Sequence, residues 1–297
     1  MEIASLEGVG FDTLAEAFAR TFADYDTQWD KEELRRMLRR RGFDPALSFG
    51  AFDKGRLVAF TFNGIGWHGG RATAYDTGTG TCAEWRGRGL AGRIFEHAAP
   101  RLKAAGVRRY LLEVLQHNAP AVAVYRKAGF ETARSFAYFR AAREQVARRL
   151  EVGSWPTQGG ARTRRSAAAE CTLRRVAPEE LAAATEFRDF EPSWQNSFAA
   201  VERAATDLML TGAYDGPRLV GYCIAEPASG DIAQIAVAHD RRREGIGSHL
   251  LAHAVAAATS STIKIINTQI GCASIEGFLA SLGIEEQGRQ FEMTKEL

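Results

Sequence analysis

The sequence predicts an α/β fold that occurs twice in a chain of 297 residues. One observation is the order strand, arginine–glycine turn, amphipathic helix, strand and helix between Tyr75 and Phe130. Another is that this order returns: residues 50–53 (GAFD) correspond to residues 212–215 (GAYD), and a second arginine–glycine turn follows at residues 242–247. A long internal repeat with one order of elements indicates two diverged copies of a single domain.

The composition is that of an ordinary globular protein. A hydrophobic content of 45% is enough for a buried core, and the length favours two domains. The net charge of +2 indicates no nucleic-acid or membrane partner. We expect no secretory signal at residues 1–4, and no apolar stretch is long enough to span a bilayer.

The four cysteines are too far apart for a zinc site or a disulfide framework. They are Cys82, Cys171, Cys223 and Cys272. We therefore expect reduced thiols in a cytoplasmic protein that holds no metal, and we leave self-association open.

The elements of the first copy follow from local patterns. Two helices, a hairpin of two strands, a third strand and a closing strand are expected at residues 11–22, 29–40, 46–52, 56–62, 72–82 and 132–139. The hairpin turn is Asp53-Lys54-Gly55, which is a typical turn sequence. Residues 63–70 contain four glycines, and this content predicts a loop.

The turn that follows the third strand is suited to a phosphate. Gly87 and Gly89 let the backbone pass close to a ligand, and Arg86 and Arg88 add positive charge. The next helix is indicated by apolar residues at helical spacing, namely Leu90, Ile94, Ala98 and Leu102. Its first N–H groups and its dipole favour an anion. The turn therefore predicts a pyrophosphate site that is made mostly of main chain.

Two other phosphate-binding motifs do not fit this turn. A Walker loop needs Gly-Lys-Ser/Thr after its glycines, and the sequence has none there. A dinucleotide fingerprint needs G-x-G-x-x-G with an acidic residue about 20 residues further on, and Gly87, Gly89 and Gly92 match its glycines by letters alone. The residues after the turn are more specific.

The whole stretch resembles the GNAT superfamily of N-acetyltransferases. The family's R/Q-x-x-G-x-G/A motif is matched by Arg86, Gly89 and Ala91, and its later motif by Asn118, Tyr125, Gly129 and Phe130. Ala83 stands where the family often has proline. The resemblance implies that each copy is a mixed, centrally splayed β-sheet flanked by helices. It also implies direct transfer of an acetyl group from acetyl-CoA to an amine acceptor.

The second copy keeps the turn but not the polar residues of the last helix. When Gly283 is aligned with Gly129, Tyr125 corresponds to Leu279 and Asn118 to Cys272. We therefore predict a catalytic N-terminal domain at residues 1–145, a linker rich in Gly, Ser and Arg at 146–170, and a degenerate C-terminal domain at 171–297.

The resemblance implies that Tyr125 protonates the departing CoA thiolate and that Asn118 helps to hold the pantetheine arm. Asp76 and Glu113 are the candidate bases, because they lie on neighbouring strands whose alternation turns one face toward the cleft. An unpaired buried carboxylate is costly, so a structural ion pair is an equal interpretation of either residue.

The expected cofactor-binding residues lie at both turns and on the last helix of the first copy. They are Cys82, Arg86, Gly87, Arg88, Gly89, Leu90, Ala91, Asn118 and Tyr125, together with Arg242, Gly245 and Gly247 of the second copy.

Three hypotheses for the function stay open at this point. The first is a tandem N-acetyltransferase with an active first copy, which acetylates a primary amine of a small molecule or peptide. The second is a regulatory protein that binds acetyl-CoA without turnover. The third is a tandem enzyme, similar to mycothiol synthase, with an active second copy. Asn118 and Tyr125 favour the first hypothesis.

Overall fold

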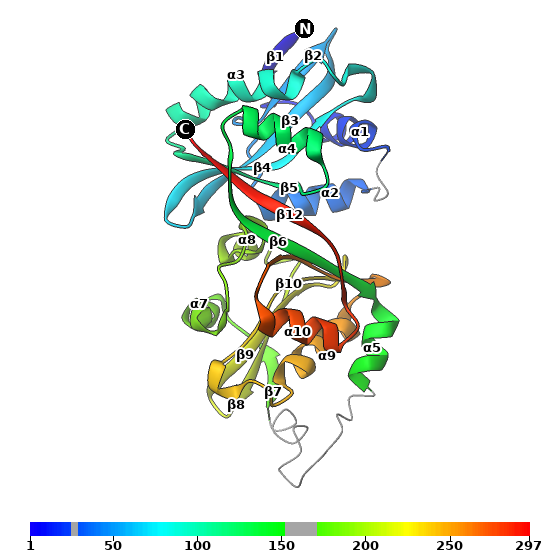
Figure 1. The fold of residues 1–297 in the computed structure, drawn as a ribbon, viewed down its shortest axis with the longest axis vertical. Helices are drawn as coiled ribbons and strands as arrows, with labels where there is room; N and C mark the ends of the chain where they lie inside the picture. Colours follow the sequence, from blue (N-terminus) through cyan, green and yellow to red (C-terminus); the bar gives the residue numbers. More distant parts are fainter. Residues whose placement is uncertain (25–28, 152–170) are drawn as a thin grey trace. The chain divides into compact units, whose positions relative to one another are not determined.

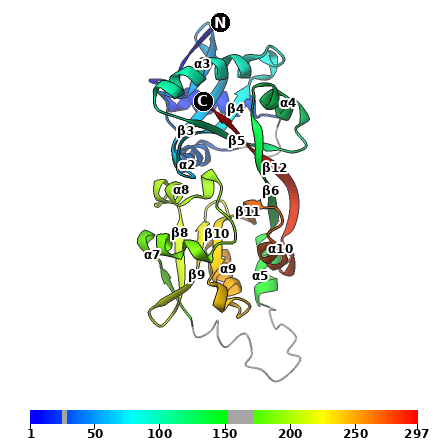
Figure 2. The same cartoon turned by 60° about the vertical axis from the view of Figure 1, so that its left-hand side comes forward.

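The computed structural model describes residues 1–24, 29–151 and 171–297, which form two compact units. The N-terminal unit comprises Met1–Arg134 and Phe291–Leu297, and the C-terminal unit comprises Ser135–Gln290. Figure 1 and Figure 2 show a β-sheet with helices on its faces in each unit. The predicted mixed α/β fold class is confirmed.

The N-terminal unit has the sheet order β1-β2-β3-β4-β5-β12, and of β12 it contains the residues from Phe291 to Glu296. Its elements are β1 (Glu2–Ser5), α1 (Phe11–Thr21), α2 (Lys31–Arg41), β2 (Phe49–Asp53), β3 (Arg56–His68), β4 (Arg71–Thr81), α3 (Leu90–Ala104), β5 (Arg109–Leu115), α4 (Ala119–Lys127) and the end of β12 (Glu285–Glu296). Strands β1 to β4 pair antiparallel, whereas β4 and β5 pair parallel.

The C-terminal unit has the sheet order β6-β11-β10-β9-β8-β7. Its elements are β6 (Glu131–Ala142), α5 (Arg143–Glu151), β7 (Thr172–Arg175), α7 (Pro178–Ala183), α8 (Phe198–Arg203), β8 (Met209–Asp215), β9 (Arg218–Glu226), β10 (Asp231–Val237), α9 (Ile246–Ala257), β11 (Thr262–Gln269) and α10 (Ala273–Ser281). Here β10 and β11 pair parallel, as β4 and β5 do. The two units therefore share one topology around the central parallel pair.

Both helices that follow the arginine–glycine turns are held by apolar stripes. In α3 the four residues of the expected stripe are 0–3% exposed, and in α9 Leu250, Leu251, Ala254 and Val255 are similarly buried. Full burial of one such aliphatic side chain stabilises the fold by about 1.5–3 kcal/mol. These helices therefore fix the end of each turn against its sheet.

The prediction of a loop at residues 63–70 is wrong. Strand β3 runs on to His68, and only Gly69 and Gly70 form the turn into β4. Their φ angles of 55° and 73° need glycine, whereas Gly64 and Gly66 are extended residues that pair with β4. Glycine content alone does not separate a loop from a strand that pairs on both sides.

The ends of the two units differ from what local patterns indicated. The expected closing strand exists as β6, but its residues Phe136–Ala142 pair with β11 of the C-terminal unit. In the N-terminal unit, Glu292 of β12 is nearly buried and forms an ion pair of 2.7 Å with Arg134. The last strand of the chain therefore completes the sheet of the first copy.

The expected linker begins later than residue 146. Residues 146–151 belong to helix α5, where Val146 is fully buried in the core of the C-terminal unit. Residues 152–170 lie outside the described part of the chain. Across the parts that the structure describes, no helix has the length and apolar character needed to cross a membrane.

Candidate active site

The arginine–glycine turn of the N-terminal unit presents main-chain N–H groups to open space. The N–H of Cys82 donates to the Val58 carbonyl (2.9 Å), which fixes the end of β4 before the turn. Gly87 and Gly89 have φ angles of 75° and 69°, and Gly89 is the N-cap of α3. A Cβ added to either glycine would meet nothing within 4 Å. Because glycine offers no capping side chain, the first N–H groups of α3 stay available to an anion.

The turn of the C-terminal unit repeats this geometry. Ala238 N donates to Val220 O at 2.9 Å, and Gly245 has a φ angle of 89° at the N-cap of α9. Arg243 stands where the first turn has Gly87 and keeps a positive φ angle of 68°. A left-handed conformation costs a non-glycine residue roughly 1–2 kcal/mol. The second turn is therefore held in its shape against a local strain.

The first arginine of each turn is bound by the protein itself. The guanidinium of Arg86 donates to the carbonyls of Thr21 and Thr81 and to the carboxylate of Asp24 (2.9 Å). Arg242 likewise bonds the carbonyls of Phe187 and Val237, and it pairs with the carboxylate of Asp189 (2.8 Å). These bonds make Arg86 and Arg242 braces of their turns.

Three other residues that were expected to bind the cofactor, Arg88, Cys82 and Asn118, contact neighbouring groups of the protein. Arg88 lies over the ring of Trp85, with 4.5 Å from the guanidinium carbon to the ring centroid. The thiol of Cys82 is buried near the hydroxyl of Thr21. The side-chain oxygen of Asn118 accepts from Ala121 N (3.3 Å) and so caps α4.

The two central strands diverge at the same point in both units. The parallel pairing of β4 and β5 covers Thr73–Tyr75, and the next residue is Asp76. In the C-terminal unit the pairing of β10 and β11 is recorded at Asp231, and the next residue is Ile232. A β-bulge follows in each strand, at Thr77 in β4 and at Ala233 in β10. Asp76 and Ile232 are therefore structurally equivalent.

Asp76 is held at this divergence by three hydrogen bonds. Its carboxylate accepts from Gly78 N (2.9 Å), from the Thr79 hydroxyl (2.7 Å) and, over a longer distance of 3.5 Å, from the Tyr125 hydroxyl. Burial raises the pKa of Asp76 to about 6, although these hydrogen bonds favour the ionised form. The structure thus brings together two of the residues that were expected to be catalytic.

The third expected catalytic residue, Glu113, has a different partner. Its carboxylate accepts a hydrogen bond of 3.0 Å from the Tyr75 hydroxyl. Burial, and then the negative charge of Glu113, raise the pKa of Tyr75 well above its usual range. Nearby, the Tyr110 hydroxyl donates to the side chain of Asn63, which is fully buried. The bond to Tyr75 gives Glu113 a structural partner.

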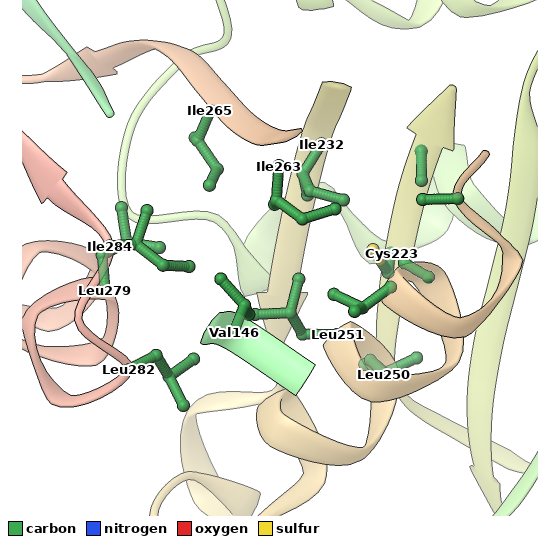
Figure 3. Packing of buried hydrophobic residues seen from close by; sticks show 14 of the residues in the cluster. Val146, Cys223, Ile232, Leu250, Leu251, Ile263, Ile265, Leu279, Leu282 and Ile284 are labelled. Carbon is green, nitrogen blue, oxygen red and sulfur yellow. The ribbon is translucent and has the colours of Figure 1, made fainter. Parts of the chain in front are cut away.

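The equivalent positions of the C-terminal unit are apolar. Leu279 of α10 corresponds to Tyr125, and Ile232 of β10 to Asp76; both are 1% exposed. Figure 3 shows their side chains in one cluster with Ile265 and Leu282, which come from β11 and from the end of α10. At the positions equivalent to Asp76 and Tyr125, this unit therefore carries neither an acid nor a phenol.

A cavity of about 840 Å³ opens between β10, β11, α9 and α10 in the C-terminal unit. The second turn, from Arg242 to Gly247, forms part of its wall, and Gln234 and Asn267 lie where the strands diverge. The cavity is thus continuous from the expected phosphate turn to the position that Asp76 occupies in the first copy.

The polar side chains inside this cavity are bonded to the protein. Gln234 accepts from the Tyr222 hydroxyl (2.8 Å), and Asn196 donates to the Ile266 carbonyl (3.0 Å). Asn267 donates to the Ser193 hydroxyl (2.9 Å) and accepts from Gln290. The three side-chain amides of Gln234, Asn196 and Asn267 are uncharged, and they line the cavity where the strands diverge.

Sequence reasoning missed Gly78 and Thr79, which hold Asp76, and the substitution of Asp76 by Ile232. The substitution could have been found, because Asp76 and Ile232 each lie ten residues before the first arginine of their turn. The support from Gly78 and Thr79 carries no sequence signal, since it depends on the bulge at Thr77.

The class of protein follows from the fold and the repeated turn, and the comparison with families agrees. The model described as "Acetyltransferase (GNAT) family" matches residues 11–130 and 175–273. The chain therefore belongs to the acetyltransferase (GNAT) family, as a tandem protein with two copies of the domain.

A curated relative matches only part of the chain. Mycothiol acetyltransferase of Corynebacterium aurimucosum is 32% identical over 112 residues, which are 35% of this chain and 37% of that protein. The match thus spans about a third of the length of this relative.

Two similar solved structures show the fold over the whole chain. A tandem GNAT protein from the clavulanic acid biosynthesis pathway has a TM-score of 0.69 at 15% identity, over 99% of this chain and 98% of that one. A GCN5-related N-acetyltransferase from Sphaerobacter thermophilus has a TM-score of 0.67 at 13% identity, over 99% and 95% of the two chains. At these identities the likeness concerns the fold alone.

Proposed function

We propose that the chain is an acetyl-CoA-dependent N-acetyltransferase that acetylates a primary amine of a small molecule or peptide in its first copy. The observation that carries this proposal is the contact between Asp76 and Tyr125 at the divergence of β4 and β5. Family membership supports acetyl transfer in general. The pair of Asp76 and Tyr125 supports acetyl transfer in the first copy, because Ile232 and Leu279, the equivalent residues of the second copy, offer no proton acceptor or donor.

The N–H groups at the start of α3 would bind the pyrophosphate of acetyl-CoA, with Gly87 and Gly89 allowing a close approach. Arg88, Leu90 and Ala91 complete this turn. Arg86 holds the turn in place through its bonds to Thr21, Thr81 and Asp24. In this proposal the main chain of the turn binds the anion, and the bonds of Arg86 hold that main chain in position.

Asp76 accepts the proton that the acceptor amine loses when its nitrogen bonds to the carbonyl carbon of the acetyl group. Tyr125 donates its hydroxyl proton to the sulfur as the carbon–sulfur bond breaks. The contact of 3.5 Å between the two groups then allows Asp76 to return a proton to Tyr125. The products are the acetylated amine and the free thiol, and both residues end in their starting protonation states.

The environment of Asp76 suits a base near neutral pH. Its pKa of about 6 leaves the carboxylate mostly ionised at pH 7 and close enough to neutrality to hold a proton. Glu113 is bonded to Tyr75, and we assign it the role of orienting that residue. Asn118 caps α4 and so positions the helix that carries Tyr125.

The test is release of CoA thiol over a panel of primary amines, with wild type and Asp76→Asn compared on any amine that is accepted. We expect Asp76→Asn to lower kcat about 10²–10⁴-fold, because it removes the base and keeps its size. Ile232→Val, at the equivalent position of the second copy, is the matched control and should keep the wild-type rate. An unchanged rate for Asp76→Asn would place the chemistry elsewhere.

A second candidate is acetyl transfer in the C-terminal unit. The cavity of about 840 Å³ beside its turn favours this alternative, and so does the similarity to a mycothiol acetyltransferase. Proton transfer there would have to use water, since apolar residues replace Asp76 and Tyr125. In that case Asp76→Asn would leave turnover intact.

A further inference from the structure

The bulge in β4 is held by a side chain from helix α2. Thr77 is the residue that the register with β3 leaves unpaired, between Asp76 and Gly78, and the recorded pairing with β5 ends at Tyr75. Thr77 is 3% exposed, and a buried main-chain carbonyl needs a hydrogen bond. The Thr77 carbonyl accepts a hydrogen bond of 2.9 Å from the guanidinium of Arg41, the last residue of α2. Arg41 therefore holds the main chain at the point where the strand pairing is interrupted.

The backbone of Arg41 is itself fixed against β3. Gly42, the C-cap of α2, has a φ angle of 74°, and its carbonyl accepts from Ile65 N at 3.0 Å. The carbonyl of Arg41 lies so close to Gly64 that a Cβ added there would overlap the carbonyl oxygen. Glycine at position 64 thus permits this approach of helix and strand. The guanidinium of Arg41 therefore reaches the bulge from a defined position.

Arg41 and Asp76 bind the two ends of one peptide group. The Thr77 carbonyl, which accepts from Arg41, and the Gly78 N–H, which donates to Asp76 at 2.9 Å, belong to the same planar unit. The next residue, Thr79, donates its hydroxyl to the other carboxylate oxygen of Asp76 at 2.7 Å. A rotation of this peptide would therefore move both donors away from Asp76.

Arg41 also brings a positive charge to a site whose other neighbours are phenols and a carboxylate. Its charge favours the ionised form of Asp76, against the effect of burial on the pKa of that residue. The guanidinium carbon of Arg41 lies 5.9 Å from the centroid of the Tyr75 ring. The other titratable groups around Asp76 are Tyr125 of α4, Tyr75 of β4, and Tyr110 and Glu113 of β5.

We propose that Arg41 is a positioning residue for the transfer reaction: its bond to the Thr77 carbonyl fixes the peptide whose N–H orients Asp76 toward the acceptor amine. A hydrogen bond to the carbonyl of a peptide also strengthens the bond that its N–H donates, because such chains polarise one another. The role of Arg41 rests on the proposed function, in which Asp76 is the base. Helix α2 is thereby linked to the base through one guanidinium and one peptide group.

The test is a titration of the Asp76 carboxyl group by carbon-13 NMR on the full protein, with the resonance assigned through Asp76→Asn. Arg41→Met keeps an unbranched stem and removes the donor and the charge. The pKa of Asp76 should rise by about 0.5–1 unit, because both losses disfavour the ionised form. On an accepted amine, kcat should fall about tenfold, with KM for acetyl-CoA changed less than about threefold. An unchanged pKa of Asp76 in Arg41→Met would overturn the proposal.

Two further variants separate the bond of Arg41 from a general effect of charge. Arg39 is exposed in the same last turn of α2, so Arg39→Met removes an equal charge and should move the pKa of Asp76 by less than about 0.2 unit. Arg41→Lys keeps a charged donor and should bring that pKa to within about 0.3 unit of wild type. Equal shifts in Arg39→Met and Arg41→Met would overturn the proposal, as would a lysine variant that titrates like Arg41→Met.

The titration and the rate fail separately. Wild-type turnover of Asp76→Asn would refute the proposed function, and with it the role of Arg41 in the reaction, whatever the titration shows. Loss of turnover in Asp76→Asn together with an unmoved pKa of Asp76 in Arg41→Met would refute the role of Arg41 alone. Should Arg41→Met fail to fold, Arg41→Gln takes its place, because its amide can still donate to a carbonyl while the charge is removed. Its expected shift has the same sign, and no shift would again overturn the proposal.

Discussion

The two units keep the same turn and differ in the residues behind it. Each arginine brace bonds two main-chain carbonyls and one carboxylate, and the central strands diverge at equivalent residues. Behind the turn, Asp76 and Tyr125 of the first copy correspond to Ile232 and Leu279 of the second. The turn that we propose binds an anion is thus independent of the pair that we propose transfers a proton.

The difference has a physical basis in the cost of a buried carboxylate. Asp76 is kept ionisable by the Gly78 amide and the Thr79 hydroxyl, which offset part of its desolvation. An isoleucine at the same place needs no such support and adds apolar burial. A copy that does not use this acid can therefore carry an aliphatic side chain in its place without altering its turn.

The largest expected effect comes from Gly89→Asp, because a like charge and a side chain would meet the phosphates at the first turn. We expect loss of acetyl-CoA binding at that site and loss of turnover, measured by calorimetry and thiol release. Gly245→Asp is the matched change in the second turn. If Gly245→Asp abolishes turnover and Gly89→Asp does not, the roles of the two copies are reversed.

Tyr125→Phe should have the next largest effect, a fall in kcat of about 10²–10⁴-fold with little change in CoA affinity. The ring keeps its packing on Phe130, at 5.7 Å between centroids, so the variant should fold. Leu279→Phe in the second copy is the control and should leave kcat unchanged. Near-wild-type turnover of Tyr125→Phe, where chemistry limits the rate, would refute the acid role.

The pH dependence should show whether Asp76 is the base, because the advantage of wild type over Asp76→Asn in kcat/KM should shrink as the solution becomes acidic. Since the pKa of Asp76 is about 6, kcat/KM should fall as pH drops through 6 and the carboxylate takes up a proton. The acceptor amine titrates as well. The ratio of kcat/KM for wild type to kcat/KM for Asp76→Asn cancels the titration of the amine and leaves that of Asp76. A ratio that stays constant from pH 5 to pH 8 would exclude Asp76 as the base.

Asp76 also predicts the sign of a stability change. In the folded protein the pKa of Asp76 is about 6, raised from its ordinary value of 3.8. The folded state therefore binds the proton more tightly than the unfolded state does. Its contribution to the free energy of unfolding should therefore decrease as pH rises from about 4 to about 6, and stay constant above. Urea titrations of wild type and Asp76→Asn should differ in this window; parallel curves would contradict the raised pKa.

The smallest effect is expected for Arg86→Lys and Arg242→Lys. A lysine cannot reproduce the fork of bonds to two carbonyls and a carboxylate. These side chains are partly exposed, at 46% and 25%, so each variant should lose only about 1 kcal/mol of stability in urea denaturation. If Arg86 contacts phosphate directly, Arg86→Lys would instead weaken CoA binding without loss of stability.

The sequence by itself determined the repeated architecture and the place of the turns. The apolar stripe of α3, the hairpin at Asp53-Lys54-Gly55 and the glycines of the turn are local features, and local periodicity and backbone freedom encode them. Tyr125 and Asp76 could be named as candidates for the same reason: a short motif and an acid on a strand are visible without partners.

Only the tertiary structure decided which groups meet. The bulge at Thr77 sets how Gly78 and Thr79 contact Asp76, and the return of Phe291–Leu297 completes the first sheet over a long separation in sequence. The bonds of Arg86 to Thr21 and Asp24, and those of the side-chain amides that line the cavity of the second copy, also join distant segments. Local patterns carry no record of such pairs, because the free energy that selects them arises when distant surfaces are buried together.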